Sequence, residues 1–160
     1  MEVRPMAEGD LPFLCDMMNE PRTLREMHMS PITLEEWRES FALWTADPEE
    51  DSYTLWQGPE PVGWMKLNEI GPGATGWISM LVVHPDHWRR GIGSAAVCWA
   101  CRWFEARGKL EVRLQARRDN APALACYAAC GFFLEEERIS PTPEEPQREI
   151  CVLSRRTLRS

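Results

Sequence analysis

The sequence predicts an α+β fold, with a mixed, mostly antiparallel central sheet flanked by helices in a single domain. Segments with the two-residue period of strands and segments with the 3.6-residue period of helices are interleaved along the chain. Turns of only a few residues join three consecutive strands in the middle of the chain, which favours antiparallel pairing. The length of 160 residues, without an internal repeat or linker, indicates one domain over residues 1–160.

In the first third of the chain the patterns predict one strand and two helices. Residues 1–6 alternate as a short strand, and residues 8–20 have the spacing of an amphipathic helix. Residues 30–47 predict a second helix, with Thr33 as its N-cap and Glu36 as the capping-box partner. The apolar residues expected to face inward from the two helices are Leu11, Leu14, Met17, Met18, Leu34, Trp37, Phe41 and Trp44.

The rest of the chain predicts six strands and two helices. Strands are expected over residues 52–57, 62–70, 77–85, 110–118, 132–139 and 148–158, with a proline-rich loop at 140–147 between the last two. In the fourth of these strands, Leu110, Val112 and Leu114 are expected on one side. Helices are expected over residues 91–108, ending at Gly108, and over residues 119–131, with Asn120 near the cap and Pro122 in the first turn.

Composition excludes several classes of protein. The hydrophobic content of 44% and the net charge of −7 are those of an ordinary globular protein and disfavour nucleic acid as a partner. The longest apolar run, residues 77–83, is too short to cross a membrane, so we expect no membrane partner. The first ten residues lack the pattern of a secretory signal, and we expect a cytoplasmic protein.

Four of the six cysteines form two close pairs that resemble zinc ligands in spacing. They are Cys98, Cys101, Cys126 and Cys130. Both pairs lie within apolar helical runs, where a free cysteine behaves as a small buried hydrophobic residue, whereas structural zinc pairs usually lie on turns. We therefore expect no metal site.

The segment HWRRGIGSAA, residues 87–96, has the composition of a phosphate site. Two arginines precede two glycines that lead into a helix, where free backbone N–H groups and the helix dipole attract anions. The letters GIGSAA also fit the dinucleotide-binding fingerprint, with Glu111 twenty residues after Gly91. That fingerprint requires a parallel strand directly before the first glycine, and here the preceding strands are expected to be antiparallel. A nucleotide oxidoreductase is kept as an alternative.

Two segments together resemble the GNAT superfamily of acyl-CoA-dependent N-acyltransferases. They are LVVHPDHWRRGIGSAAV, residues 81–97, and DNAPALACYAACGFF, residues 119–133. The resemblance is detailed over about residues 75–135, and the order of the elements extends it to the whole chain. Trp88 departs from the family pattern, which usually has arginine or glutamine at that position.

The resemblance implies acetyl-CoA as cosubstrate and assigns roles to named residues. The pyrophosphate of coenzyme A would lie on Arg89, Arg90, Gly91, Ile92, Gly93 and Ser94. The pantetheine arm would pair with the backbone of Leu81, Val82 and Val83, as a strand added to a sheet edge. Asn120 would support the pantetheine, and Tyr127 would give a proton to the departing thiolate.

The resemblance leaves the acceptor half of the reaction open. The family's usual glutamate is replaced by Trp77, so the candidates for removing the proton from the amine are Glu69 and ordered water. The acceptor is expected to be an amine of a small molecule or peptide, selected by residues 15–45 and the loop at 140–147. A homodimer is one expected assembly. A non-catalytic coenzyme A-binding module on the same fold is the first alternative to the transferase, ahead of the nucleotide oxidoreductase.

Overall fold

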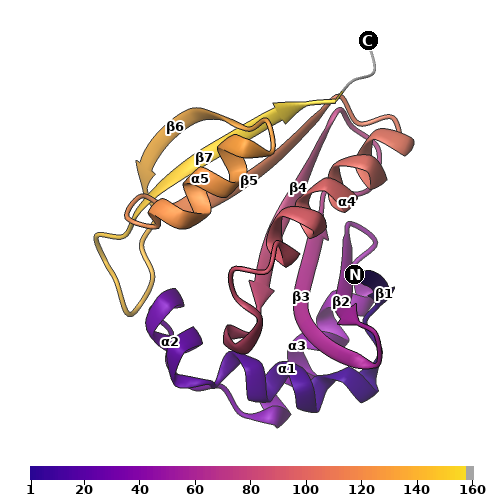
Figure 1. Cartoon of the computed structure of the whole chain (residues 1–160), viewed down its shortest axis with the longest axis vertical. Coiled ribbons are helices and arrows are strands. Elements are labelled where there is room, and N and C mark those ends of the chain that lie inside the picture. Colours follow the sequence, from indigo (N-terminus) through magenta and orange to yellow (C-terminus); the bar gives the residue numbers. More distant parts are fainter. Residues whose placement is uncertain (158–160) are drawn as a thin grey trace.

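A seven-stranded sheet forms the centre of the molecule, and helices cover both of its faces (Figure 1). The computed structural model describes residues 1–157. The strands are β1 (Glu2–Pro5), β2 (Glu50–Gln57), β3 (Glu60–Asn68), β4 (Thr75–Val83), β5 (Glu111–Arg117), β6 (Phe133–Ile139) and β7 (Glu149–Arg156), in the order β1-β2-β3-β4-β5-β7-β6. Every neighbouring pair is antiparallel except β4 with β5. This arrangement confirms the predicted mixed, mostly antiparallel sheet.

Five α-helices accompany the sheet in the described residues. They are α1 (Leu11–Met18), α2 (Pro21–Met27), α3 (Leu34–Ala46), α4 (Ile92–Ala106) and α5 (Ala121–Ala129). The sequence patterns did not predict α2, and the first predicted helix extended to residue 20. Helix α2 forms because Pro21 suits its first position and the Glu20 carboxylate caps it, accepting hydrogen bonds from the backbone N–H groups of Arg22 and Thr23. No helix among residues 1–157 combines the length and apolar character that crossing a bilayer requires.

The two faces of the sheet carry separate cores. Helices α4 and α5 cover one face, with Ile92, Ala96 and Phe104 buried against the strands. Helices α1 and α3 cover the other, where Leu11, Leu14, Met17 and Met18 are all buried as their spacing predicts. The prediction for Leu110 was wrong. Strand β5 begins one residue later, and the Leu110 side chain is 54% exposed in the connection that precedes it.

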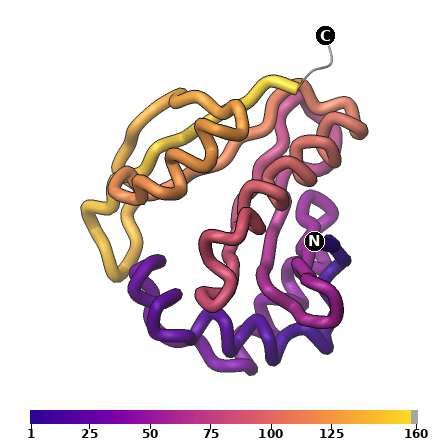
Figure 2. Tube along the Cα trace, in the orientation of Figure 1, coloured from indigo at the N-terminus to yellow at the C-terminus, as the bar shows by residue number. Residues whose placement is uncertain are grey.

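Strands β4 and β5 pair over only part of their lengths. Their parallel pairing runs from Thr75 and Glu111 to Ile78 and Leu114 and then stops. Beyond that point β5 stays with β7 and β4 stays with β3, so the two halves of the sheet diverge, as the trace in Figure 2 shows. A β-bulge at Ser79 marks the place, because Lys66 pairs with Met80 whereas Leu67 pairs with Ile78.

The last two strands form the outer part of the diverging half. Residues of β6 are exposed along the whole strand, which is an edge of the sheet. The predicted last strand included Leu158, which lies outside the described residues. The loop between β6 and β7 approaches α2, since Nδ1 of His28, directly after α2, lies 3.5 Å from Oε1 of Glu145 in that loop.

Candidate active site

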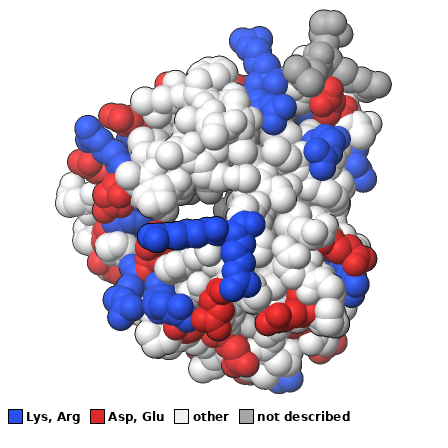
Figure 3. Space-filling view, viewed as in Figure 1, with Lys and Arg blue, Asp and Glu red and all other residues white. Residues whose placement is uncertain are grey.

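A cleft of about 660 Å³ lies between the diverging strands. Figure 3 shows the surface hollowed at the middle of the molecule, with Lys or Arg side chains along the edge of the hollow. Its lining comes from β4, the start of α4, β5, α5, α2 and the start of β7. The lining residues are Thr23, Glu26, Met27, 78–83, His87, Trp88, Arg89, 91–94, 114–117, Asn120, Pro122, Ala123, Cys126, Tyr127, Arg148 and Ile150.

The cleft passes from one face of the sheet to the other. Consecutive residues of a strand point to opposite faces, and here consecutive residues of both β4 and β5 line the same space. Leu81 and Val83 pack with the α4 and α5 core, whereas Met80 and Val82 pack with the α1 and α3 core. The opening therefore has a side toward α4 and α5 and a side toward α2.

The edge of β4 presents backbone groups to the cleft. The His84 N–H donates to Val62 O (2.8 Å), so Val83 and Gly63 are a non-hydrogen-bonded pair. By the alternation of an antiparallel ladder, Leu81 and Val83 direct their N–H and C=O groups away from β3, toward the diverging side. Val82 differs from the prediction, because its backbone pairs with Trp64 and only its side chain reaches the cleft.

The Trp88 side chain is hydrogen-bonded to one of these backbone groups. Its indole Nε1–H donates to the carbonyl oxygen of Val83 at 2.8 Å, and the ring is 40% exposed at the cleft. The tryptophan that departs from the family pattern therefore ties the turn after β4 to the strand. Leu81 N–H, Leu81 C=O and Val83 N–H remain as the groups facing the diverging side.

The first turn of α4 forms the anion-attracting end of the cleft. Gly91 is the N-cap with φ 78°, a conformation that glycine adopts without strain, and no side chain caps this helix. Within the described chain, the N–H groups of residues 91–94 have no backbone partner, and the helix dipole adds positive potential there. Arg89 lines the cleft at this end, whereas Arg90 does not. The Nη1 atom of Arg90 instead lies 3.2 Å from Nδ1 of His87.

Helix α5 brings Asn120 and Tyr127 to the same cleft, as their seven-residue spacing predicts. The side-chain oxygen Oδ1 of Asn120 caps α5 by accepting from Ala123 N–H (3.3 Å), which leaves the side-chain N–H₂ group for other contacts. The Tyr127 ring lies 6.4 Å from the Phe132 ring, between centroids. Burial raises the pKa of Tyr127 to about 12, so the phenol is protonated throughout the neutral range.

The cysteines are all free in the described structure, and three of the four that resembled a zinc site lie within α4 and α5. Cys126 lines the cleft, and its Sγ atom lies 3.1 Å from Ser94 Oγ. Residues 1–157 contain no group of three or more His, Cys, Asp or Glu side chains placed to hold a metal ion. The Cys126–Ser94 contact thus joins α5 to the first turn of α4.

The structure does not bring Glu69 to the cleft. Glu69 follows β3 with φ 55°, and its side chain is exposed at the bend before β4, outside the lining. Sequence reasoning placed it near the reaction because it ends a strand next to β4, but it lies at the end where β4 and β5 are still paired. Glu26 is the one carboxylate among the described residues that line the cleft. It lies on α2, the helix that the sequence patterns did not reveal.

Glu111, the acidic residue of the dinucleotide interpretation, is engaged elsewhere. Its carboxylate accepts from Ser154 Oγ at 2.6 Å and pairs with Arg113 at 3.2 Å (Oε2 to Nη2). It is absent from the cleft lining. Strand β4 does pair in parallel with β5, but residues 84–90 separate it from Gly91, whereas the fingerprint places the first glycine directly after the strand. The dinucleotide interpretation therefore lacks both its acidic residue and its strand-to-glycine junction.

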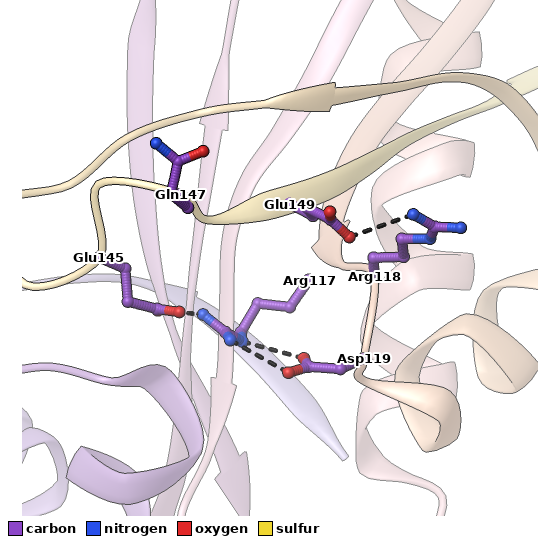
Figure 4. A pocket seen from close by; sticks show the side chains of 6 residues that line it. All are labelled: Arg117, Arg118, Asp119, Glu145, Gln147 and Glu149. Atoms are coloured by element: carbon purple, nitrogen blue, oxygen red, sulfur yellow. Dashed lines mark hydrogen bonds and ion pairs between the residues drawn. The ribbon is translucent and has the colours of Figure 1, made fainter.

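A second depression, of about 450 Å³, adjoins the cleft at Arg117 (Figure 4). Arg117 reaches Glu145 in the β6–β7 loop and Asp119 at 3.1 Å (Nε to Oδ1), while Arg118 pairs with Glu149 at 3.1 Å (Nη1 to Oε2). Hydrogen bonds from Arg117 hold the pKa values of Glu145 and Asp119 below their usual range. These pairs fasten the loop to β5, and the arginines of this depression are neutralised by its own carboxylates.

Comparison with known proteins agrees with this geometry. Residues 13–132 match the family model described as "Acetyltransferase (GNAT) family". The chain is 33% identical over 90 residues to streptothricin acetyltransferase of Escherichia coli, a match that covers 55% of this chain and 51% of that protein. It is 39% identical over 69 residues to mycothiol acetyltransferase of Clavibacter michiganensis subsp. michiganensis, covering 43% of this chain and 21% of that protein. The chain thus spans about half or less of the length of these curated relatives.

Solved structures share the fold over nearly the whole chain. The spermidine N-acetyltransferase of Vibrio cholerae, in complex with CoA and spermine, superposes with a TM-score of 0.85 at 17% identity, covering 98% of this chain and 95% of that one. The ribosomal-protein-S18-alanine N-acetyltransferase of Escherichia coli has a TM-score of 0.75 at 20% identity, covering 99% and 95%. The diverging strands, the glycine turn before α4 and the matched family model lead to one conclusion: this chain belongs to the acetyltransferase (GNAT) family.

Proposed function

We propose that this protein transfers an acetyl group from acetyl-CoA directly to the amine of a small molecule or peptide. One observation carries the proposal: the first turn of α4, the open edge of β4 and Tyr127 all line a single cleft. A volume of about 660 Å³ is within the range of small-molecule sites.

The α4 side of the cleft has the donor groups that coenzyme A requires. The free N–H groups of residues 91–94, with Arg89 beside them, suit a diphosphate. The backbone of Leu81 and Val83 suits the amides of an extended pantetheine arm, which would add to β4 where β5 has left it. The Asn120 amide lies on the opposite wall and completes a polar track along the cleft.

Tyr127 is the proposed proton donor to the leaving thiolate. Its raised pKa keeps the phenol protonated, which is the form that donates. A free thiol has a pKa near 8.5, so the phenol is the weaker acid in water. Inside the cleft the same loss of solvation also raises the pKa of the thiol, so the departing thiolate is a stronger base there than in water and takes up a proton from the phenol more readily.

Glu26 replaces Glu69 as the proposed acceptor of the proton that the ammonium must lose before it attacks. It lines the side of the cleft toward α2, and it is the carboxylate there. A negative side chain at that place both attracts the cationic amine and removes its proton, directly or through water. The acetyl group, supplied by the thioester of acetyl-CoA, then passes to the neutral nitrogen.

Direct transfer is favoured over a covalent acyl-enzyme. Cys126, which lines the cleft, contacts the hydroxyl of Ser94, and a hydroxyl does not activate a thiol as a histidine does. The amine must therefore reach the thioester itself, which the opening through the sheet permits.

The decisive experiment measures thiol release from acetyl-CoA with a panel of amines, together with calorimetric binding of acetyl-CoA alone. We expect binding together with amine-dependent thiol release. Binding without release from any amine would support the non-catalytic coenzyme A module and contradict the transferase proposal.

A further inference from the structure

We propose that the acceptor is a small amino carboxylate, whose carboxylate group pairs with Arg148. The inference rests on the proposed transferase function and narrows its substrate class. The charges on the side of the cleft toward α2 support it.

Arg148 is held in place but not neutralised. It lies just before β7 and lines the cleft together with Ile150, which points to the same side of the strand. Its Nε donates to Ser140 O at 2.8 Å and its Nη2 to Ser140 Oγ at 3.0 Å, so the planar guanidinium has a fixed orientation. No carboxylate of the described residues lies within 4 Å of it, and Nη1 donates to no described group.

The neighbouring arginines make the contrast clear. Arg113 pairs with Glu111, Arg117 with Asp119 and Glu145, and Arg118 with Glu149. The chain has 25 acidic and 18 basic residues, so carboxylates are plentiful. The half-buried guanidinium of Arg148 has no carboxylate partner among the described residues, so it is suited to bind an anionic ligand. A carboxylate matches the planar arrangement of its N–H donors.

Thr23 supplies a second, independent observation. It lines the same cleft from α2, and its hydroxyl is buried without a hydrogen-bond partner in the described structure. Buried hydroxyl groups normally have partners, because leaving one unpaired is unfavourable. A polar ligand beside α2 would satisfy this hydroxyl group.

Glu26 lies one turn after Thr23 on α2, so this side of the cleft carries one carboxylate and one unpaired guanidinium. That pair of charges complements a zwitterion, with its ammonium toward Glu26 and its carboxylate toward Arg148. A polyamine, the acceptor in the names of several structural neighbours, would instead place a positive charge near Arg148.

The test compares matched acceptors in the wild-type enzyme. The standard α-amino acids and small ω-amino acids are assayed beside their amides, their decarboxylated amines and the corresponding aminophosphonates, with spermidine and spermine added. We expect the best amino carboxylate to exceed its amide and its amine by about tenfold or more in kcat/KM, as for a charge-assisted hydrogen bond. Equal rates for the matched set, or a preference for polyamines or phosphonates, would overturn the proposal.

Two variants of Arg148 test whether this residue causes the preference for the amino carboxylate. Arg148→Leu should lower kcat/KM for the amino carboxylate to about that for its amide, so that the ratio between the two falls from about tenfold to about one. Arg148→Lys, which keeps the charge but not the fork, should retain part of the preference. Arg118→Leu is the matched control, since Arg118 lies outside the cleft lining and should leave the ratio unchanged. Circular dichroism and thermal melting verify that each variant is folded.

Failure of this proposal and failure of the transferase proposal give different results. If amines are acetylated but the carboxylate brings no advantage, only the acceptor class is wrong. If no amine is acetylated, calorimetry of the acetyl-CoA-loaded protein with the same amino acids still tests the anion site. Binding that Arg148→Leu abolishes would support it, and the absence of binding would contradict it.

Discussion

The two sides of the cleft are built in different ways. On the α4 side, most of the groups that face the cleft are backbone: the N–H groups of residues 91–94 and the open edge of β4 at Leu81 and Val83. On the α2 side they are side chains, namely Thr23, Glu26 and Arg148. The first set comes from one continuous stretch of about a dozen residues, whereas the second comes from segments more than 100 residues apart.

The contrast separates the groups that secondary structure directs into the cleft from those that tertiary packing brings there. Backbone groups are directed by secondary structure, so any sequence that forms this strand, turn and helix presents them in the same way. Side chains that meet across a cleft depend on how distant segments pack and on which residue occupies each position. The α4 side of the cleft accordingly depends mainly on secondary structure, and the α2 side depends on the particular side chains at a few positions of this chain. Four predictions test that division, in order of expected effect.

Tyr127→Phe should lower kcat by about 100-fold while changing the Kd of acetyl-CoA by less than about twofold, because the phenol acts on the leaving group and not on binding. Burial raises the pKa of Tyr127 to about 12, which favours the neutral phenol. The donor is therefore retained as pH rises and is lost only near that value. Wild-type kcat should show no decline from phenol ionisation between about pH 9 and about pH 11. Unchanged turnover in the variant would remove the phenol from the reaction.

Glu26→Gln should lower kcat/KM for the amine by about 30-fold at pH 7 and by less than about threefold at pH 10, where the free amine no longer needs a base. Glu69→Gln is the matched control and should behave as wild type, because Glu69 is exposed outside the cleft. The pH–rate profiles of the two variants show which of the two carboxylates removes the proton from the amine. A loss in the Glu69 variant instead would restore the interpretation that the sequence first suggested.

The double substitution Arg89→Ala and Arg90→Ala should weaken acetyl-CoA binding by about tenfold at low salt and by less at high salt, because both side chains are exposed and screened. The KM of the amine should stay the same. Calorimetry at two ionic strengths measures the first effect, and Arg102→Ala, on the exposed surface of α4, serves as control. An increase in the amine KM alone would contradict the division between the two sides.

Trp88→Phe should have the smallest effect, about a threefold weaker Kd for acetyl-CoA, which corresponds to one hydrogen bond of ordinary strength. The indole N–H holds the Val83 carbonyl, and phenylalanine keeps the ring without that donor. Titration of the variant with acetyl-CoA measures the change. A loss of tenfold or more would mean that the ring contacts the ligand itself.

Most residues on the α4 side of the cleft could be located from the sequence because the signals there are local. Gly91 must adopt a positive φ before a helix, and a glycine-rich turn at that place is visible in the letters alone. Asn120 and Tyr127 line the cleft together because seven residues are two helical turns. Val82 is the exception: which residues of β4 face β3 depends on the register of that pair, and the alternation of the sequence does not fix it.

The region expected to select the acceptor, residues 15–45 and the loop at 140–147, contains Thr23 and Glu26 and ends next to Arg148. Which of its side chains face the cleft could not be predicted, because they meet only through tertiary packing. Helix α2 is seven residues long and lacks a clear apolar period, so Glu26 had no visible helix to place it. Arg148 was assigned only to a strand, and its position depends on the β6–β7 loop that Arg117 fastens through Glu145. Glu69 illustrates the opposite error, since nearness in sequence to β4 placed it at the paired end of the strands.

The early end of the β4–β5 pairing has a consequence for the order of events in turnover. A passage that crosses the sheet has two mouths, so neither reactant has to wait behind the other and both can be present at once. In the proposed reaction, the spent thiol carrier and the acetylated product would also depart on separate routes. Double-reciprocal plots for the two substrates should then intersect, and neither product should block the release of the other.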